Sequence, residues 1–262
     1  MIFKAIFMAL ICGVTEFLPV SSNGHVIILK ELMGFEGPAG MMFELSLQLG
    51  AISAVCWLYR SKLTHTVLNA TRNPTDRLFA FKILLAFLPA AIVGFVFHHY
   101  ITEHLFNARV VATMLILGGI AILTIEKYKP ATKTVTVDDI SPKTALIIGL
   151  FQVLSLIPGV SRSGATIMGA LLLGVERKVA TEFSFFLAIP IIFVAGLYDI
   201  FKNRHELSSD SVVLLVVGFV IAFVCALAVV KWLLTYLTRH GFIPFAWYRI
   251  IVGSAVLAYL FF

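Results

Sequence analysis

The sequence has few charged residues for its length. Only 13% of its 262 residues are charged and 60% are hydrophobic, with a mean hydropathy of +0.99. Soluble chains carry about 25% charged residues, and a water-facing surface built from half that fraction would expose large apolar patches. This scarcity excludes an ordinary soluble domain, a disordered chain and a coiled coil, and it indicates a polytopic membrane protein.

Cysteines are few, and the N-terminus does not have the pattern of a leader. Cys12, Cys56 and Cys225 each lie inside an apolar run, a spacing that favours neither a disulfide framework nor a zinc site. The first residues show no basic leader and no small-residue cleavage site, so we expect them to belong to the mature protein. The net charge of +6 predicts no nucleic-acid partner, because Lys and Arg gather in the cytoplasmic loops of membrane proteins.

Six apolar runs approach the roughly 20 residues that a helix needs to cross a bilayer. They cover residues 43–58, 78–97, 110–125, 183–201, 212–237 and 245–262. Two further apolar stretches, 1–34 and 144–174, are interrupted by Pro19-Val-Ser-Ser-Asn-Gly-His25 and by Pro158-Gly-Val-Ser-Arg-Ser-Gly-Ala-Thr166. Both interruptions are too polar and turn-prone for lipid-exposed helix. We interpret each stretch as a re-entrant helical hairpin; two kinked full spans are the alternative.

The order of hairpin, three spans, hairpin, three spans predicts an internal duplication within one integral membrane domain. The first repeat covers residues 1–126 and the second covers 143–262, and Phe43-Glu44-Leu-Ser is echoed by Glu182-Phe-Ser. Because three spans is an odd number, the second repeat must be inverted, and the two hairpin tips can meet near the midplane. The predicted fold is therefore an all-α, inverted-topology repeat with six transmembrane helices plus two re-entrant helical hairpins.

Lysine and arginine predict the orientation of these segments. One predicted face carries Arg60, Lys62, Arg72, Arg77, Lys127, Lys129, Lys133, Lys143, Arg177, Lys178 and Arg239. The other carries Arg109, Lys202 and Arg204, with Lys30 near its edge. The first face is expected to be cytoplasmic, so both termini and the opening of the first hairpin are expected on the periplasmic side. Lys82 and Arg249 fall at predicted span ends, where long cationic side chains normally snorkel to the interface.

The first interruption carries candidate catalytic groups. Glu16 and His25 lie inside an apolar run, where an unpaired charge costs on the order of 3 kcal/mol, so we expect each to have a partner or a function. The turn adds further polar groups and a flexible glycine: Ser21, Ser22, Asn23 and Gly24. Capping of the following helix by Ser or Asn is the structural alternative for these residues.

The second interruption has the residues of a phosphate cradle. Arg162 stands in a loop with three hydroxyls and a neighbouring glycine, namely Ser161, Ser163, Gly164 and Thr166. A bidentate cation beside free backbone donors at a helix N-terminus suits a phosphate group. Snorkelling of Arg162, or a structural pair with Glu16, is the alternative.

Together the two loops predict a site for a phosphate ester. Glu16 would repel a phosphate unless a cation stood between them, so we expect a divalent cation, Mg²⁺ or Ca²⁺, with Glu16 as its protein ligand. Ser22 and His25 compete for the role of nucleophile, and His25 also suits general acid-base catalysis.

These motifs, with Phe43-Glu-Leu-Ser-Leu-Gln-Leu-Gly50 and the closing Phe242-Ile-Pro-Phe-Ala-Trp-Tyr-Arg249, resemble the undecaprenyl pyrophosphate phosphatase, or bacitracin-resistance, family over nearly the whole chain. The resemblance implies an inner-membrane enzyme that hydrolyses undecaprenyl pyrophosphate to undecaprenyl phosphate and inorganic phosphate, which recycles the lipid carrier for cell-wall synthesis. It also implies the inverted-repeat fold and a divalent-metal requirement. By position, it assigns function to Glu16, Ser22, His25, Ser161, Arg162, Ser163 and Thr166.

Two positions depart from the family pattern. Cys12 stands where the family usually has Glu or Gln, one helical turn before Glu16, and a thiol is a poor ligand for Mg²⁺. Asn23 replaces the more usual Thr, a mild change because both cap helices. The sequence leaves open a transporter or flippase of an anionic prenyl-phosphate lipid, and a paralogue acting on another lipid diphosphate. It also leaves the oligomeric state open, with a homodimer as one option.

Overall fold

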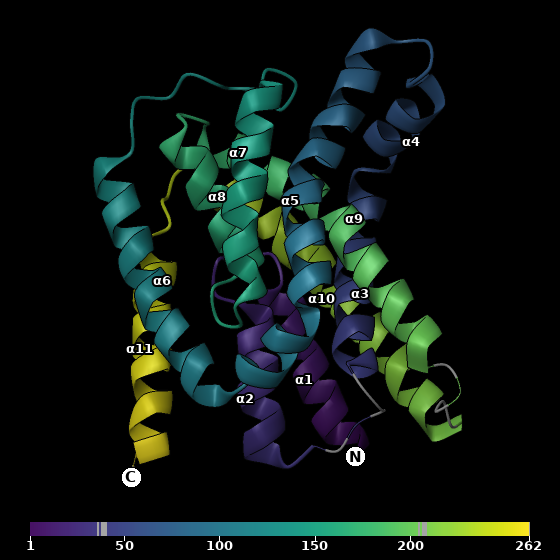
Figure 1. The fold of residues 1–262 in the computed structure, drawn as a ribbon, viewed down its shortest axis with the longest axis vertical. Coiled ribbons are helices and arrows are strands. Elements are labelled where there is room, and N and C mark those ends of the chain that lie inside the picture. Colours follow the sequence, from purple (N-terminus) through teal and green to yellow (C-terminus); the bar gives the residue numbers. More distant parts are fainter. Residues whose placement is uncertain (36, 38–40, 204, 206–208, 262) are drawn as a thin grey trace.

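The computed structural model describes residues 1–35, 37, 41–203, 205 and 209–261, which form helices joined by loops, the one between α6 and α7 being long (Figure 1). The elements are α1 (Ile2–Thr15), α2 (Ser22–Met33), α3 (Met42–Leu58), α4 (Arg60–Asn69), α5 (Pro74–His104), α6 (Ala108–Tyr128), α7 (Pro142–Val153), the 3-10 turn η1 (Leu154–Leu156), α8 (Arg162–Leu172), α9 (Arg177–Asn203), α10 (Ser209–Tyr236) and α11 (Ile243–Phe261). Arg204 and Phe262, which the predicted loops and spans include, lie outside the described residues.

The described helices are those of a multi-pass membrane protein. α5, α6, α9, α10 and α11 are each long and apolar enough to cross a bilayer, and α3 with α4 forms a sixth candidate that is bent by 78°. α4 occupies a stretch that the sequence predicts only as a loop between spans. It is fixed to the start of α5 by the hydroxyl of Thr66, which donates to Asp76 Oδ1 at 3.2 Å.

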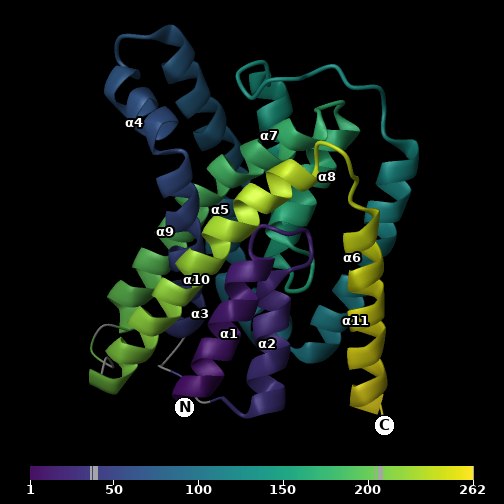
Figure 2. The same cartoon turned by 180° about the vertical axis from the view of Figure 1, so that it is seen from behind.

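The two interrupted stretches enter the helical bundle from opposite ends. α1 runs inward from the end that carries both termini and α2 runs back to that end, whereas α7 runs inward from the end that carries α4 and α8 runs back to that end (Figures 1 and 2). Their connecting loops approach each other in the middle of the molecule. α1 packs against α10, and α7 packs against α5. The interruptions therefore lie next to each other, although almost 140 residues of chain separate them.

Close helix contacts use small residues. A Cβ added at Gly119 of α6 would lie 2.7 Å from the carbonyl oxygen of Ala246 in α11, and one added at Gly253 of α11 would lie 2.7 Å from the carbonyl oxygen of Ala112 in α6. Lipid tails are as apolar as the helix surfaces, so helix association in a bilayer depends on such close packing. A larger side chain at either glycine would separate α6 from α11.

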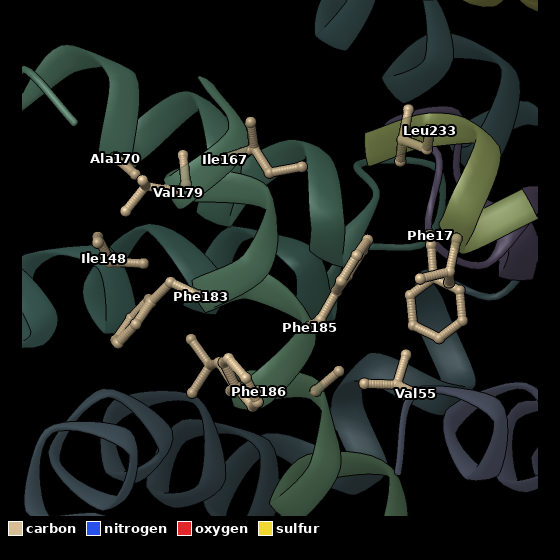
Figure 3. Packing of buried hydrophobic residues seen from close by; sticks show 14 of the residues in the cluster. Phe17, Val55, Ile148, Ile167, Ala170, Val179, Phe183, Phe185, Phe186 and Leu233 are labelled. Carbon is tan, nitrogen blue, oxygen red and sulfur yellow. The ribbon is translucent and has the colours of Figure 1, made fainter. Parts of the chain in front are cut away.

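An aromatic cluster holds the first interruption in place. Phe17, in the loop after α1, is fully buried and meets the ring of Phe185 edge to face, with ring centroids 5.1 Å apart. Figure 3 shows Phe17 between Phe185 of α9, Val55 of α3 and Leu233 of α10. Edge-to-face aromatic pairs add about 0.5–1.5 kcal/mol to ordinary packing. The loop is thus anchored on helices from both halves of the chain.

The expected snorkelling of Lys82 and Arg249 is wrong. Lys82 is 2% exposed and Arg249 is 1% exposed. Lys82 Nζ donates to the carbonyl oxygen of Asp138 at 2.7 Å, so its charge is directed into the loop before α7. Arg249 is directed toward the two interruptions.

Candidate active site

Both interruptions end in the same local structure. Ser21 before α2 has φ 71° and Ser161 before α8 has φ 76°; they are the two non-glycine residues with positive φ in the part of the chain that the structure describes. Each side chain caps its helix by accepting from a backbone N–H three residues later, Gly24 N at 3.3 Å and Gly164 N at 3.0 Å. Such strained caps persist only where the surrounding structure enforces them.

Gly24 and Gly164 provide space rather than flexibility. A Cβ added at Gly24 would lie 2.9 Å from Val111 Cγ1, and one added at Gly164 would lie 3.2 Å from a guanidinium nitrogen of Arg249. Both glycines lie in the first turn of a helix. They allow α2 and α8 to start close to their neighbours, which brings the two helix N-termini to one place.

A chain of polar contacts joins the two interruptions. Glu16 Oε2 accepts a hydrogen bond from the hydroxyl of Ser22, and Glu16 Oε1 accepts from Arg162 Nη2 at 3.2 Å. The other terminal nitrogen of Arg162 donates to the carbonyl oxygen of Ser184 at 3.1 Å. Glu16 and Ser22 are each 7% exposed, and the side chain of Arg162 is 12% exposed. A buried carboxylate is therefore paired with a buried guanidinium and receives a serine hydroxyl on its second oxygen.

The other predicted hydroxyls of the second interruption have protein partners. Ser163 Oγ donates to the carbonyl oxygen of Leu18 at 2.8 Å, which ties α8 to the loop after α1. Thr166 Oγ1 donates to Ser184 Oγ at 2.7 Å, and Ser161 Oγ lies 3.1 Å from Ser163 Oγ. These contacts give Ser161, Ser163 and Thr166 a role in holding Arg162 and its loop.

His25 lies one turn after Ser22 on α2, but its ring nitrogens are directed elsewhere. Nδ1 lies 2.8 Å from the carbonyl oxygen of Ser21, and Nε2 lies 2.8 Å from the hydroxyl of Tyr248 in α11. The structure thus brings Glu16, Ser22 and Arg162 into direct contact, whereas the ring of His25 contacts Ser21 and Tyr248.

Arg249 is a site residue that sequence reasoning missed. All its contacts are backbone carbonyl oxygens: Nε donates to Leu115 (3.2 Å), Nη1 to Pro19 and Val160 (3.0 Å each), and Nη2 to Met114 (3.0 Å) and Gly159 (2.9 Å). One guanidinium therefore holds both interruptions and α6 together. The available signal was an arginine inside the last apolar run, which the sequence assigned to a span end.

A cavity leads away from the start of α2. It has a volume of about 330 Å³ and is lined by Asn23, Ile27, Lys30, Glu31, Met41, Glu44 and Phe106. Asn23 Oδ1 accepts from Gln48 Nε2 at the inner side of α2, and Lys30 Nζ contacts Glu44 Oε1 at 2.6 Å farther along it. Four of its lining residues, Asn23, Ile27, Lys30 and Glu31, belong to α2, which runs toward the end of the bundle that carries the termini (Figure 1).

The residues around Glu16 offer a metal ion one carboxylate. Among the described residues, no group of three His, Cys, Asp or Glu side chains could hold a metal ion. Cys12 Sγ lies 4.0 Å from Glu16 Oε2, in the place where the resembled family usually has Glu or Gln, and Glu44 is paired with Lys30. A site made by protein alone does not fit these residues. Mg²⁺ shared between one carboxylate and substrate phosphates does fit them.

Comparison with known proteins decides the family. The family described as bacitracin resistance protein BacA matches residues 5–255. The chain belongs to the BacA family. A protein of Parvibaculum lavamentivorans named undecaprenyl-diphosphatase is 48% identical over 97% of this chain and 95% of its own length. A relative from Methylobacillus flagellatus is named undecaprenyl-diphosphatase and is 46% identical over 99% of this chain and 98% of its own length. A relative from Rhodospirillum rubrum is named undecaprenyl-diphosphatase 2 and is 48% identical over 98% of this chain and 94% of its own length.

Proposed function

We propose that this protein is an undecaprenyl-diphosphatase, which releases the terminal phosphate of undecaprenyl diphosphate and returns undecaprenyl phosphate for cell-wall synthesis. The observation that carries the proposal is the contact of Ser22 with Glu16 and of Glu16 with Arg162 across the two interruptions. The names of relatives 46–48% identical over nearly the whole chain favour hydrolysis over the transport of a prenyl-phosphate lipid. The apolar surface of the spans suits a prenyl tail.

Ser22 is the nucleophile that the geometry favours. Its hydroxyl already donates to Glu16, so the carboxylate can take the proton as Ser22 Oγ attacks the terminal phosphorus. The bond from that phosphorus to the bridging oxygen breaks, undecaprenyl phosphate leaves, and a phosphoserine remains. Water then attacks the same phosphorus, and His25 takes its proton and later releases it to solvent. Inorganic phosphate leaves as Ser22 regains the proton held by Glu16.

Arg162 and the helix N-termini supply positive charge at the reacting phosphate. The planar guanidinium suits two oxygens of a diphosphate, and the first turns of α2 and α8 present backbone N–H groups. Charge developing on the transferred phosphoryl group is stabilised most by such fixed donors in a buried site. Asn23, at the head of the cavity along α2, is placed to contact the phosphate as it enters or leaves.

A divalent cation, Mg²⁺ or Ca²⁺, completes the proposed site. Glu16 and the oxygens of the diphosphate would hold it together. When bound, it would neutralise phosphate charge and polarise the phosphorus centre. This arrangement explains how an acidic side chain and an anionic substrate can share one small site.

The proposed architecture is an inverted repeat with the site facing the periplasm. The matching serine caps support it, because Ser21 and Ser161 have the same backbone conformation and the same capping contact. The contacts of α6 with α11 also support it, since each helix packs a glycine against an alanine carbonyl of the other: Gly119 against Ala246 and Gly253 against Ala112. The excess of Lys and Arg in the loops at the α4 end supports an orientation with both termini, and the open end of the α1–α2 hairpin, in the periplasm.

Phosphate release by the purified protein in detergent tests the function. We expect wild type to hydrolyse undecaprenyl diphosphate and Ser22→Ala to lose at least about 100-fold in kcat. Ser46→Ala is the matched control, because Ser46 is equally buried (7% exposed) but donates to Phe43 O within α3. Inactive wild type would reject the function, and a Ser22→Ala enzyme as active as Ser46→Ala would reject the nucleophile.

A further inference from the structure

Tyr248 is the residue whose side chain completes the surroundings of His25. Its hydroxyl lies 2.8 Å from His25 Nε2, and the two rings are stacked with centroids 5.6 Å apart and planes 11° from parallel. The two residues come from opposite ends of the chain, α2 and α11. A contact that combines ring stacking with a hydrogen bond fixes both the position and the rotation of the imidazole.

The proton positions in this contact follow from the partners. The carbonyl oxygen of Ser21 can only accept, so Nδ1 of His25, 2.8 Å away, carries a proton. In the neutral imidazole Nε2 is then an acceptor, and the hydroxyl of Tyr248 donates to it. Ser21 therefore sets the tautomer of His25, and Tyr248 sets the direction in which the basic nitrogen points.

The placement of Tyr248 is itself fixed by the next residue. Arg249 donates to carbonyl oxygens in both interruptions and in α6, as described above. This clamp sets the height and rotation of α11 beside α2. The hydroxyl of Tyr248 consequently meets His25 without a separate adjustment of the helix, which is the condition for a preorganised site.

We propose that Tyr248 is a positioning residue for hydrolysis: its hydroxyl and its stacked ring fix the orientation of the His25 imidazole on α2. The proposal rests on the proposed function for its kinetic part only. Tyr248 is 42% exposed, so a stabilising role through burial is a poor explanation for its place. Replacement by Phe keeps the stacked ring and removes only the hydrogen bond.

The kinetic test compares Tyr248→Phe with Tyr259→Phe, an exposed tyrosine on the same helix. We expect Tyr248→Phe to lower kcat about 10-fold, the equivalent of about 1.4 kcal/mol, with KM within about 2-fold of wild type. Tyr259→Phe should match wild type. An unchanged kcat would overturn the proposal. A change in KM alone would also overturn it, because that result indicates loosened packing that affects substrate binding and not the chemical step.

A spectroscopic test on the substrate-free protein is independent of activity. The chain has seven histidines, so ¹⁵N-histidine spectra of wild type and His25→Gln identify the His25 signals. We expect the Nε2 resonance of His25 to shift in Tyr248→Phe toward that of an imidazole nitrogen without a donor, and to stay in place in Tyr259→Phe. An unmoved resonance would overturn the proposal even if kcat fell. If wild type were inactive on the lipid diphosphate, the proposed function would be rejected. The spectra would still show whether Tyr248 donates a hydrogen bond to His25.

Discussion

At the scale of single residues, the site depends on a buried acid that has two kinds of partner. Glu16 accepts from the guanidinium of Arg162 on one oxygen and from the hydroxyl of Ser22 on the other. Removing one member of a buried ion pair costs about 3–5 kcal/mol, so the pair must form whenever the two interruptions come together. The pairing of Glu16 with Arg162 therefore assembles the site and also holds Glu16 where it accepts the hydrogen bond from Ser22.

Cys12 predicts an unusual dependence on metal concentration. Among the residues that the structure describes, Glu16 is the one carboxylate that contacts Arg162. Cys12→Glu should therefore add a second ligand one helical turn away and raise the apparent affinity for Mg²⁺ about 10-fold or more. Titration of phosphate release with Mg²⁺ after chelation measures this. Adding a carboxylate at another cysteine is not a suitable control, because Cys225→Glu would disrupt a span. Cys12→Ser is the control, since it changes the same position without adding a carboxylate, and it should behave like wild type.

Equal metal dependence in wild type and Cys12→Glu would contradict the prediction. Activity in both that is indifferent to a chelator would reject the proposed cation altogether. The two results are distinct, because the first concerns the place of the ion and the second concerns its presence.

The sequence predicts which residues belong to the site better than it predicts their hydrogen-bond partners. Glu16, Ser22 and Arg162 stand out because charged and hydroxylated groups are costly inside apolar runs. Arg249 carries the same signal, but the neighbouring aromatic residues are equally typical of an interface. Nothing in the local sequence shows that its five hydrogen bonds lead to Pro19, Gly159 and other distant carbonyl oxygens.

At the scale of elements, α11 links the two interruptions through Arg249, and Gly118 of α6 makes room for it. A Cβ added at Gly118 would lie 1.9 Å from Arg249 Nη2. We expect Gly118→Ala to displace the guanidinium and to lower the stability of the folded protein by roughly 2 kcal/mol or more, since buried carbonyl oxygens lose their donors. Thermal unfolding in detergent, with phosphate release in parallel, measures the effect.

Gly94→Ala in α5 is the matched control for Gly118→Ala. Its added Cβ would lie 3.3 Å from Leu156 Cδ2, the end of a flexible side chain. Because alanine has the higher helix propensity, this variant should be neutral or slightly stabilised. Two variants with equal unfolding temperatures and equal activities would show that the clamp does not hold the site.

The hairpins and spans follow from apolar run length and from Pro and Gly, and α1, α2, α7 and α8 lie where these signals place them. α4 could not be predicted in the same way. Residues 60–69 are too polar for a span and too short for a strong helical period. Contacts with the start of α5, such as Thr66 with Asp76, decide its conformation.

At the scale of the whole molecule, the proposed orientation predicts which end is exposed outside the cell. Ser61 at the α4 end and Thr102 at the other end are both exposed. In a variant without Cys12, Cys56 and Cys225, an impermeant maleimide applied to intact cells should label Thr102→Cys and spare Ser61→Cys until the membrane is opened. The reverse pattern would place the open end of the α1–α2 hairpin in the cytoplasm.

The central claim is that side chains from the two oppositely inserted interruptions act as one catalytic unit. A double-mutant cycle on kcat/KM with Glu16→Gln, Arg162→Lys and the double variant tests it most directly, because the residues come from different hairpins and touch only at the site. We expect a coupling of about 1–3 kcal/mol, so that the double variant is much less impaired than the two single losses added together. Losses that add to within about 0.5 kcal/mol would contradict the account.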